Sequence, residues 1–454
     1  MLPPASGRGL LRRVLPLLAA AGSARCAAPR AVVLDGTWQL RNGTLHVPAA
    51  VPGTVPGALF AAGVAPDPQF GRNQLDVFHA AAAQTWTYSR SFTAPGCSAA
   101  AAHQRCELVF AGIDTAATVR VNGVTVGQAN DMHLRWVLDV TKQLQQAQPP
   151  HTVEVEIQPA TEYARAQAVA NGDPNCTKHT RNFWPQKWGH GTECSGYIRK
   201  NTGSFGWDCA PAYMTAGIWK SVTLRVIEGA AIDMVAPQIR GKVNPEQPEA
   251  SNSFQVEVRA FIVAASACTG KLHVSGDWSG DATASTQVRL RPSTAEAPQL
   301  VTLTLDAKDV KLCKRRCTPL SIGRACHLQL TRRWPLCIGW PNGMGPSTQT
   351  RFNLTTTLRL DGGGESSVVH AVGFRTFEFV GSVGNGTERH GEANASLWFR
   401  VNGAPLYAKG NNWMPSSVLT ADDASYQAMT VVRRTIICCL SKRSRQQRSV
   451  NISA

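Results

Sequence analysis

Short runs of alternating apolar and polar residues recur along most of the chain. The runs are TVEVEIQ, SVTLRVIE, SFQVEVRAF, LVTLTLD and LTTTLRLDG, and the first places Val153, Val155 and Ile157 on one face. A period of two over such short runs predicts half-buried β-strands. No long amphipathic helical pattern accompanies them. The sequence therefore predicts a mainly β fold built from sandwiches.

Two Asn-Gly pairs each separate two of these runs. Asn122-Gly123 lies in ATVRVNGVTVG, and Asn402-Gly403 lies in LWFRVNGAPLYAKG. A two-residue hairpin turn of type I′ needs positive φ at both central positions, which Asn and Gly adopt readily. We therefore expect a tight hairpin at each pair.

The predicted strands group into two sandwiches. The first, over residues 31–228, is large enough for a jelly roll, and the second, over residues 229–376, has the size of an immunoglobulin-like sandwich; the resemblance described below implies that the jelly roll is of the galactose-binding-like kind. A third element begins after Phe374-Arg375. The chain of 454 residues is long enough for two or three domains.

Residues 1–26 have the pattern of a secretory signal peptide. Arg8, Arg12 and Arg13 precede the apolar run VLPLLAAA, and small residues follow in AGSARCA. The run is too short to span a bilayer as a helix, so we favour a cleaved signal over an anchor. We expect a mature chain without a membrane span in the secretory pathway, where disulfides and N-glycans form.

Glycosylation sequons agree with that compartment. Each Asn-X-Ser/Thr triplet is a weak signal alone. They occur at Asn42, Asn175, Asn353, Asn385, Asn394 and Asn451.

The net charge of +16 is confined to three segments. Residues 1–30, 313–338 and 433–454 carry seventeen Lys and Arg and no acid, which leaves −1 for the rest of the chain. A nucleic-acid-binding face should instead lie on a folded domain. We therefore expect no nucleic-acid partner.

The cysteines are likewise divided between the basic segments and the rest of the chain. Cys97 with Cys106, and Cys176 with Cys194, are plausible local disulfides, although spacing does not fix the pairing. A basic segment over residues 313–339 holds four more, and a zinc site there is an alternative. Their gaps match no usual zinc spacing, so we expect no metal. These four are Cys313, Cys317, Cys326 and Cys337.

Five long stretches, taken together and in this order, resemble the β-mannosidases of glycoside hydrolase family 2. They are LDGTWQLRNG, QTWTYSRSF, LVFAGIDTAATVRVNGVTVGQANDMHLRWVLDVT, YIRKNTGSFGWDCAPAYMTAGIWKSVTLRV and LWFRVNGAPLYAKGNNWMPSSVL. The resemblance covers residues 31–432 apart from the basic segment. It implies a jelly roll, an immunoglobulin-like sandwich and a (β/α)₈ barrel, of which residues 377–432 would be the start.

The resemblance also implies an activity and a location. The family's β-mannosidases are lysosomal or secreted glycosidases that remove terminal non-reducing β-D-mannose in glycan catabolism, with retention and without a cofactor. The partner would be a β-mannoside oligosaccharide or a glycoprotein-derived glycan.

The catalytic carboxylates of that family have no counterpart in the sequence. A retaining glycosidase needs two carboxyl groups about 5–5.5 Å apart. In the family both are Glu on later barrel strands, and the acid/base follows Asn. The sequence contains no Asn-Glu pair, and fewer than fifty residues follow Tyr407, whereas a barrel takes about 250. We assign no catalytic residue and expect this polypeptide to be inactive alone.

One sugar-contacting residue of the family has a match. The Asp of its GWDWGP motif, which reaches the sugar's hydroxyls, corresponds to Asp208 in FGWDCAP. Cys209 and Ala210 replace the family's Trp and Gly there, which puts the geometry in doubt. Asp208 as a turn or cap residue is the alternative. Trp207 and Trp413 are candidates for stacking on sugar or for the core.

A different class of function competes with this one. The chain could be a secreted, non-catalytic β-sandwich protein that binds a glycan or a protein partner. A third interpretation is another specificity within family 2, which a substrate panel would distinguish.

The basic segment 313–339 and the tail 433–454 lack strand alternation and interrupt the resemblance. We interpret both as translated non-coding sequence, with a lineage-specific loop and tail as the alternative. Long-read sequencing of the transcript should therefore show reads that skip codons 313–339 and continue past codon 433 into a barrel with an Asn-Glu pair. Reads that match the chain as written would contradict this prediction.

Overall fold

A computed structural model shows a mainly β protein, as predicted. The predicted signal 1–26, the basic segment 313–339 and the tail 433–454 lie outside the residues that the structure describes. No helix among the described residues is long and apolar enough to cross a membrane. The described residues are 29–68, 70–97, 104–176, 192–206, 212, 214–242, 252–278, 282–310, 340–341, 350–381, 397–406 and 408.

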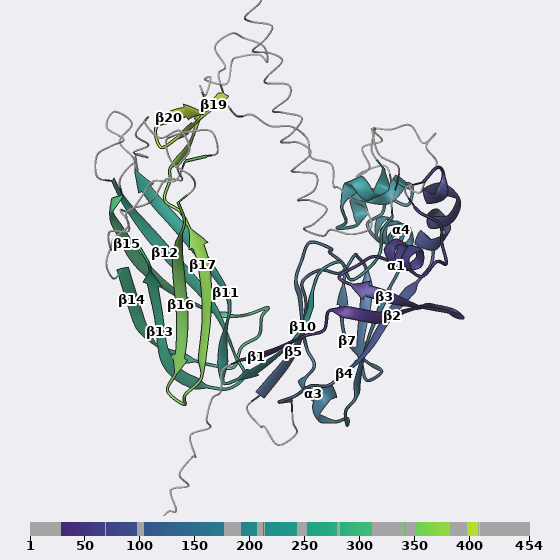
Figure 1. Ribbon diagram of the computed structural model, residues 1–454, viewed down its shortest axis with the longest axis horizontal. Coiled ribbons are helices and arrows are strands. Elements are labelled where there is room, and N and C mark those ends of the chain that lie inside the picture. Colours follow the sequence, from purple (N-terminus) through teal and green to yellow (C-terminus); the bar gives the residue numbers. More distant parts are fainter. Residues whose placement is uncertain are drawn as a thin grey trace, which may run out of the picture.

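Two antiparallel sheets form the first sandwich (Figure 1). One has the strand order β1-β10-β5-β8, and the other has the order β3-β2-β4-β9-β6-β7. Their facing sides enclose a core that runs from Leu34 to Val226. The strands are β1 (Arg30–Val33), β2 (Gly36–Asn42), β3 (Leu45–Val51), β4 (Trp86–Phe92), β5 (Gln104–Phe110), β6 (Ala117–Val121), β7 (Val124–Ala129), β8 (Trp136–Asp139), β9 (His151–Ile157) and β10 (Val222–Glu228).

The predicted alternation is confirmed in this core. Along β9, Val153, Val155 and Ile157 are at most 1% exposed, and the residues between them are half-buried. Val222 and Leu224 in β10 are fully buried in the same way. Burying one such side chain stabilises the fold by about 1.5–3 kcal/mol, so each strand is held to one register by its apolar face.

Both predicted Asn-Gly hairpins are present. Asn122 and Gly123 have φ of 50° and 79° and join β6 to β7. Asn402 and Gly403 have φ of 51° and 77° and join β19 (Leu397–Val401) to β20 (Ala404–Leu406). Positive φ at both positions is typical of the type I′ turn.

A second sandwich pairs two further antiparallel sheets, with the orders β11-β12-β15 and β14-β13-β16-β17. Phe374 lies at the centre of its core, fully buried, with its ring centroid 5.2–5.6 Å from those of Phe254, Trp278 and Phe352. The strands are β11 (Ala230–Lys242), β12 (Asn252–Ala264), β13 (Cys268–Gly276), β14 (Ala282–Leu290), β15 (Gln299–Val310), β16 (Phe352–Leu360) and β17 (Glu365–Val372).

The residues on either side of the basic segment belong to this second core. Val310 ends β15 and is fully buried, and Trp340 is 6% exposed in the same cluster. Residues from both sides of the basic segment 313–339 therefore pack in the core of the second sandwich.

A small sheet follows the second sandwich. β18 (Phe377–Gly381), β19 and β20 pair antiparallel in that order. Asn402 extends the pairing of this sheet, because its backbone N–H donates to Thr376 O at 3.0 Å and its Oδ1 accepts from Thr376 N at 2.9 Å. Val401 of β19 is buried in the core of the second sandwich and so joins the sheet to it. Barrel strands are parallel, so the start of a barrel within residues 377–432 stays a prediction for the part beyond this sheet.

Helices are short and lie mainly at one end of the first sandwich (Figure 1). Thr54 caps α1 by accepting a hydrogen bond from Gly57 N at 3.3 Å. The helical elements are α1 (Val55–Ala61), a π-helical turn (Gln74–Phe78), α2 (His79–Ala82), α3 (Thr141–Gln145), α4 (Ala160–Ala170) and two 3₁₀ turns (Thr192–Tyr197 and Thr202–Phe205).

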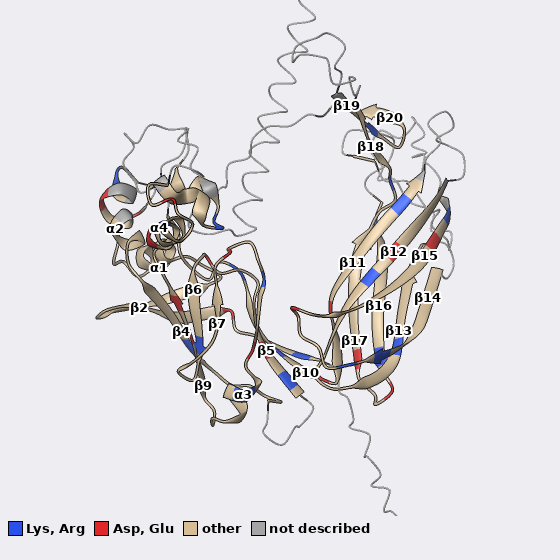
Figure 2. Ribbon diagram, turned by 180° about the vertical axis from the view of Figure 1, so that it is seen from behind, with Lys and Arg blue, Asp and Glu red and all other residues tan. Residues whose placement is uncertain are grey.

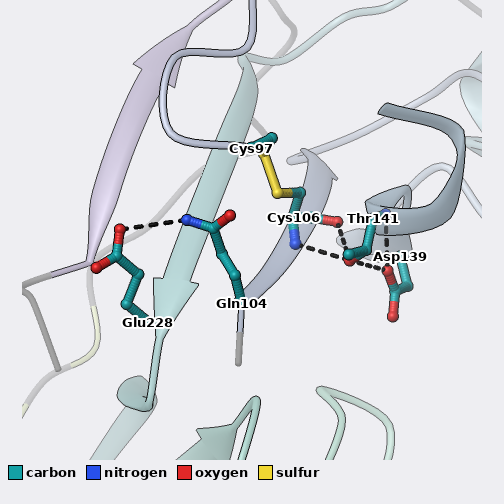
Figure 3. Close-up of a disulfide and its surroundings, with 6 residues drawn as sticks. All are labelled: Cys97, Gln104, Cys106, Asp139, Thr141 and Glu228. Carbon is teal, nitrogen blue, oxygen red and sulfur yellow. Dashed lines mark hydrogen bonds between the residues drawn. A yellow bond between two sulfur atoms is a disulfide. The ribbon is translucent and has the colours of Figure 1, made fainter. Parts of the chain in front are cut away.

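A disulfide joins Cys97 to Cys106 at the beginning of β5 (Figure 3). The backbone N–H of Cys106 donates to Thr141 Oγ1 at 2.9 Å, and that hydroxyl donates to Asp139 Oδ1 at 2.6 Å. On the other side, Gln104 Nε2 donates to a carboxylate oxygen of Glu228 at 3.2 Å. The start of β5 is thus fixed covalently and by hydrogen bonds.

A buried ion cluster connects the two sandwiches at the junction of β10 and β11. Figure 2 shows β5 and β10 at the side of the first sandwich that faces the second. Arg225 lies 2.5 Å from Glu107 Oε2 in β5 and 2.7 Å from Asp233 Oδ1 in β11. Asp233 also lies 2.6 Å from Arg135. Burial opposes the charge on Arg225, but the two carboxylates outweigh it and raise its pKa. We call Glu107, Arg225, Asp233 and Arg135 the junction cluster.

Replacement of Arg225 by Met should destabilise the protein strongly. The change would leave the carboxylates of Glu107 and Asp233, whose side chains are 2% and 5% exposed, without their shared cation. The loss of one partner of a buried pair costs about 3–5 kcal/mol. Chemical denaturation measures the free energy of unfolding. Arg359→Met is the matched control, because Arg359 and Glu365 are 68% and 50% exposed and should change it by less than about 1 kcal/mol. An equal effect of both variants would contradict the prediction.

Candidate functional site

Trp207, Asp208 and Trp413 all lie outside the described residues. The structure does describe the chain on both sides of Asp208, however. We call residues 199–206 the first stem and residues 212 and 214–219 the second stem. Between them lies WDCAP, the 207–211 segment. The candidate site is built from the residues that hold these stems.

A small satellite core supports the first stem. Phe205 is 5% exposed and packs in a cluster with Ala164 and Ala168 of α4 and with Cys176 and Cys194. These two cysteines form a disulfide, one of the two local pairings considered from the sequence. The first stem therefore packs on α4 before it reaches the 207–211 segment.

The hydroxyl of Tyr197, just before the first stem, donates to Asp173 Oδ2 at 2.7 Å. Burial and this carboxylate together raise the pKa of Tyr197 to about 12. The tyrosine therefore stays protonated at physiological pH and serves as a hydrogen-bond donor.

Backbone contacts attach the first stem to the loop before β8. Met132 N donates to Arg199 O at 3.0 Å, and Asn201 N lies 3.0 Å from the sulfur of Met132. Arg199 Nε lies 3.2 Å from Asp131 Oδ2, although the Arg199 side chain is 78% exposed. The ion pair is therefore a surface contact, and the backbone bonds fix the position.

The second stem is attached to the same loop and to the beginning of α1. Trp219 Nε1 donates to Met132 O at 3.0 Å. Gly53 N donates to Ile218 O at 2.9 Å. At Gly217 an added Cβ would lie 2.4 Å from Gly53 O, so only glycine permits this close approach of two backbones.

A buried charge cluster lies where the two stems meet. Lys200 has a fully buried side chain, and its Nζ donates to Asp114 Oδ2 at 2.5 Å. The same Nζ donates to the carbonyl oxygen of Thr215 at 2.8 Å and to Thr215 Oγ1 at 3.2 Å. Thr215 Oγ1 donates to Asp114 Oδ2 at 2.7 Å, and Thr115 Oγ1 donates to Asp114 Oδ1. We call these four residues the Asp114 cluster.

Burial shifts the pKa values of groups in and beside the Asp114 cluster. Burial lowers the pKa of Lys200, while the Asp114 carboxylate acts in the opposite direction. Tyr88 in β4 is fully buried, and its hydroxyl has no hydrogen-bond partner in the described part of the chain. Burial, and next the charge of Asp114, raise the pKa of Tyr88. The Asp114 carboxylate thus pairs with a buried lysine and also raises the pKa of a buried phenol.

The two stems come into contact immediately beside the 207–211 segment. Gly206 has φ of 96°, and an added Cβ there would lie 3.6 Å from the Cβ of Ala212. The described ends of the two stems therefore lie close together. The described residues gather no group of three or more His, Cys, Asp or Glu that could bind a metal.

The sequence did not single out Asp114, Lys200 or Thr215. Asp114 and Lys200 are 86 residues apart, and no local pattern links them. The one available signal was Lys200 itself, which stands eight residues before Asp208 in the stretch that carries the resemblance.

Similarity to known proteins extends over most of the chain. Residues 38–220 match the family described as the glycosyl hydrolase 2 galactose-binding domain-like family. The chain is 29% identical to a β-mannosidase of Mus musculus over 393 residues, which is 84% of this chain and 38% of the mouse protein. It is 28% identical to a β-mannosidase B of Aspergillus terreus over 82% of this chain and 36% of the fungal one. The chain thus spans about two fifths of these relatives.

Two solved structures share the fold. The β-D-mannosidase of Dictyoglomus thermophilum matches with a TM-score of 0.67 at 22% identity, over 88% of this chain and 42% of that one. The exo-chitosanase of Amycolatopsis orientalis matches with a TM-score of 0.54 at 17% identity, over 85% of this chain and 37% of that one.

Three of the predicted glycosylation sites lie within the described residues. Asn175 is exposed beside Cys176. Asn42 Nδ2 donates to Thr85 O, and Asn353 Nδ2 donates to Asp277 Oδ2, both at 2.9 Å. Asn385, Asn394 and Asn451 lie outside the described residues.

We expect Asn175 to carry an N-glycan in a larger fraction of molecules than Asn42 or Asn353. A glycan bond replaces one N–H of the amide, and at Asn42 and Asn353 this amide already donates to the fold. Mass spectrometry after secretory expression should show the loss of one glycan in Asn175→Gln, with Asn353→Gln as the control. An unmodified Asn175 would contradict the prediction.

Proposed function

We propose that this chain is the N-terminal portion of a β-mannosidase of glycoside hydrolase family 2 and forms the non-catalytic part of such an enzyme, a proposal supported by the match of residues 38–220 and by the similarity to β-mannosidases. The whole enzyme would remove terminal non-reducing β-D-mannose from glycan fragments, with retention. The attachment of both stems beside Asp208 carries the proposal, because it is the feature of this fold that would present a sugar-binding side chain.

Asp208 is the proposed sugar contact. A carboxylate accepts hydrogen bonds from two neighbouring hydroxyls, and charged acceptors make stronger hydrogen bonds than neutral ones. Trp207 and Trp413 are proposed as neighbouring aromatic surfaces, because aromatic faces suit the apolar side of a sugar ring. Specificity for mannose would then come from which hydroxyls lie within reach of Asp208.

The catalytic carboxylates would come from a barrel outside this sequence. A retaining glycosidase needs an acid/base and a nucleophile about 5–5.5 Å apart, and no residue of this chain is proposed for either role. The secretory pathway, ending in the lysosome or outside the cell, is the proposed location. The two disulfides support it, because such bonds persist in oxidising compartments.

The 454-residue polypeptide should bind a β-mannoside without hydrolysing it. We expect no release of nitrophenol from p-nitrophenyl β-D-mannopyranoside above the buffer blank. Saturation-transfer NMR should detect methyl β-D-mannopyranoside, with a weaker signal from the β-glucoside. Asp208→Ala should abolish the signal, whereas Asp76→Ala, a change at an exposed carboxylate of the same domain, should retain it.

The hydrolysis assay and the binding assay distinguish the candidate functions. Hydrolysis by the pure polypeptide would refute the non-catalytic assignment. Binding that survives Asp208→Ala would favour the alternative, a secreted β-sandwich protein that recognises a glycan or a partner through another surface.

A further inference from the structure

Asn122, in the turn between β6 and β7, connects the two sheets of the first sandwich at the end where α3 lies (Figures 1 and 2). Its backbone N–H donates to Thr152 O at 2.8 Å, and its Oδ1 accepts from Thr152 N at 3.0 Å, which fixes the turn to β9. Its Nδ2 donates to Gln143 O of α3 at 3.0 Å. α3 is itself bonded to β5, because Cys106 N donates to Thr141 Oγ1. One amide side chain thus links β9 of one sheet to a helix that is bonded to the other sheet.

The buried imidazole of His151 contacts the same amide. His151 begins β9 and is 3% exposed, and its Nδ1 lies 3.2 Å from Asn122 Nδ2. The orientation of the amide is fixed, because its oxygen accepts from Thr152 N and its nitrogen donates to Gln143 O. The second N–H of that nitrogen is therefore directed at His151, whose Nδ1 must accept. The partners thus assign a neutral imidazole with its proton on Nε2.

Protonation of His151 conflicts with this contact. A proton on Nδ1 would turn the acceptor into a donor that faces the N–H of Asn122. The ring of Phe92 in β4 has its centroid 5.8 Å from that of His151, and an aromatic ring attracts a cation, but it cannot replace the lost hydrogen bond. Burial lowers the pKa of His151 from its ordinary value of 6.5. The folded protein therefore disfavours the charged ring.

Charged residues on the elements around His151 are paired with other groups or exposed. In β6 and β9 they alternate with the buried residues and lie on the other face of the sheet. In β4, Arg90 donates to the carbonyl oxygens of Leu34 and Asp35. Lys142 of α3 is exposed, and its positive charge would oppose a charge on the ring. The pairs are Arg120 with Glu156, Arg41 with Glu154, and Asp139 with the hydroxyl of Thr141.

We propose that His151 is an acid-sensitive latch on the β6–β7 hairpin. The neutral ring accepts from Asn122 and holds the turn against β9 and α3, and protonation of the ring releases it. The latch needs neither Asp208 nor a bound sugar, so it stands apart from the proposed function. Because the unfolded state binds the proton more readily than the folded state, the stability that the latch contributes is present above pH 6.5 and is lost as the pH falls below it.

Hydrogen–deuterium exchange of the 454-residue polypeptide at about pH 7.5 and about pH 5 tests the latch, because exchange reports local opening. After correction for the intrinsic rates, peptides that cover residues 117–129 and 141–146 should exchange roughly fivefold faster at the lower pH. Peptides that cover β12 should not change. His151→Asn should abolish the difference, because the Oδ1 of asparagine takes the place of Nδ1 as an acceptor and does not titrate.

Asn122→Asp should reverse the preference of the ring. A carboxylate in place of the amide accepts from a protonated Nδ1 and favours the charged form, while an Asp-Gly pair still suits the type I′ turn. The lost donation to Gln143 O is the same at every pH. NMR of isotope-labelled histidine side chains should show that His151 titrates below 6.5 in the wild-type protein and above 6.5 in Asn122→Asp.

His273→Asn is the matched control, because His273 lies half-buried in β13 of the second sandwich. It should keep the wild-type dependence of hairpin exchange on pH. The proposal is overturned if the wild-type hairpin exchanges alike at both pH values, or if the difference persists in His151→Asn. If His151→Asn does not fold, the NMR titration decides, and a pKa of His151 that is the same in the wild-type protein and in Asn122→Asp overturns the latch.

Discussion

A charge removed from water must find a complete set of partners, and this constraint fixes the parts of the molecule that the hydrophobic cores leave undetermined. The cores align strands within each sandwich, but apolar packing tolerates small slips. Arg225 between Glu107 and Asp233, and Lys200 between Asp114 and Thr215, tolerate none without an unpaired charge. The first set fixes one sandwich against the other, and the second fixes the two stems against the first sandwich.

The sandwiches and the small satellite core have different structural roles. The sandwiches supply rigid sheets, and a small core around the Cys176–Cys194 disulfide supports the stem that leads to Asp208. Under the proposed function, recognition would lie on the residues between the two stems, in keeping with the way loops on rigid scaffolds carry binding residues.

The sequence predicted the features that depend on neighbours along the chain. The alternation in β9 and the two Asn-Gly turns were correct because each is decided within a few residues. The buried pair of Asp114 and Lys200 was missed, because its partners come together only through the fold. Trp340 shows the same limit, since its burial in the second core depends on strands distant in sequence. The roles of Asp208, Trp207 and Trp413 were inferred from a family motif and remain predictions, since these residues lie outside the described part of the chain.

The order of strands in the first sandwich has a consequence for its folding. β10 lies between β1 and β5, so residues 222–228 complete a sheet that begins at residue 30. Pairings so distant along the chain are slow to form, because a long loop must close first. During synthesis, β5 leaves the ribosome well before the partner that covers its edge. The strand that closes the first sandwich continues through Gly229 into β11, so the second sandwich starts to be made only as the first becomes able to close.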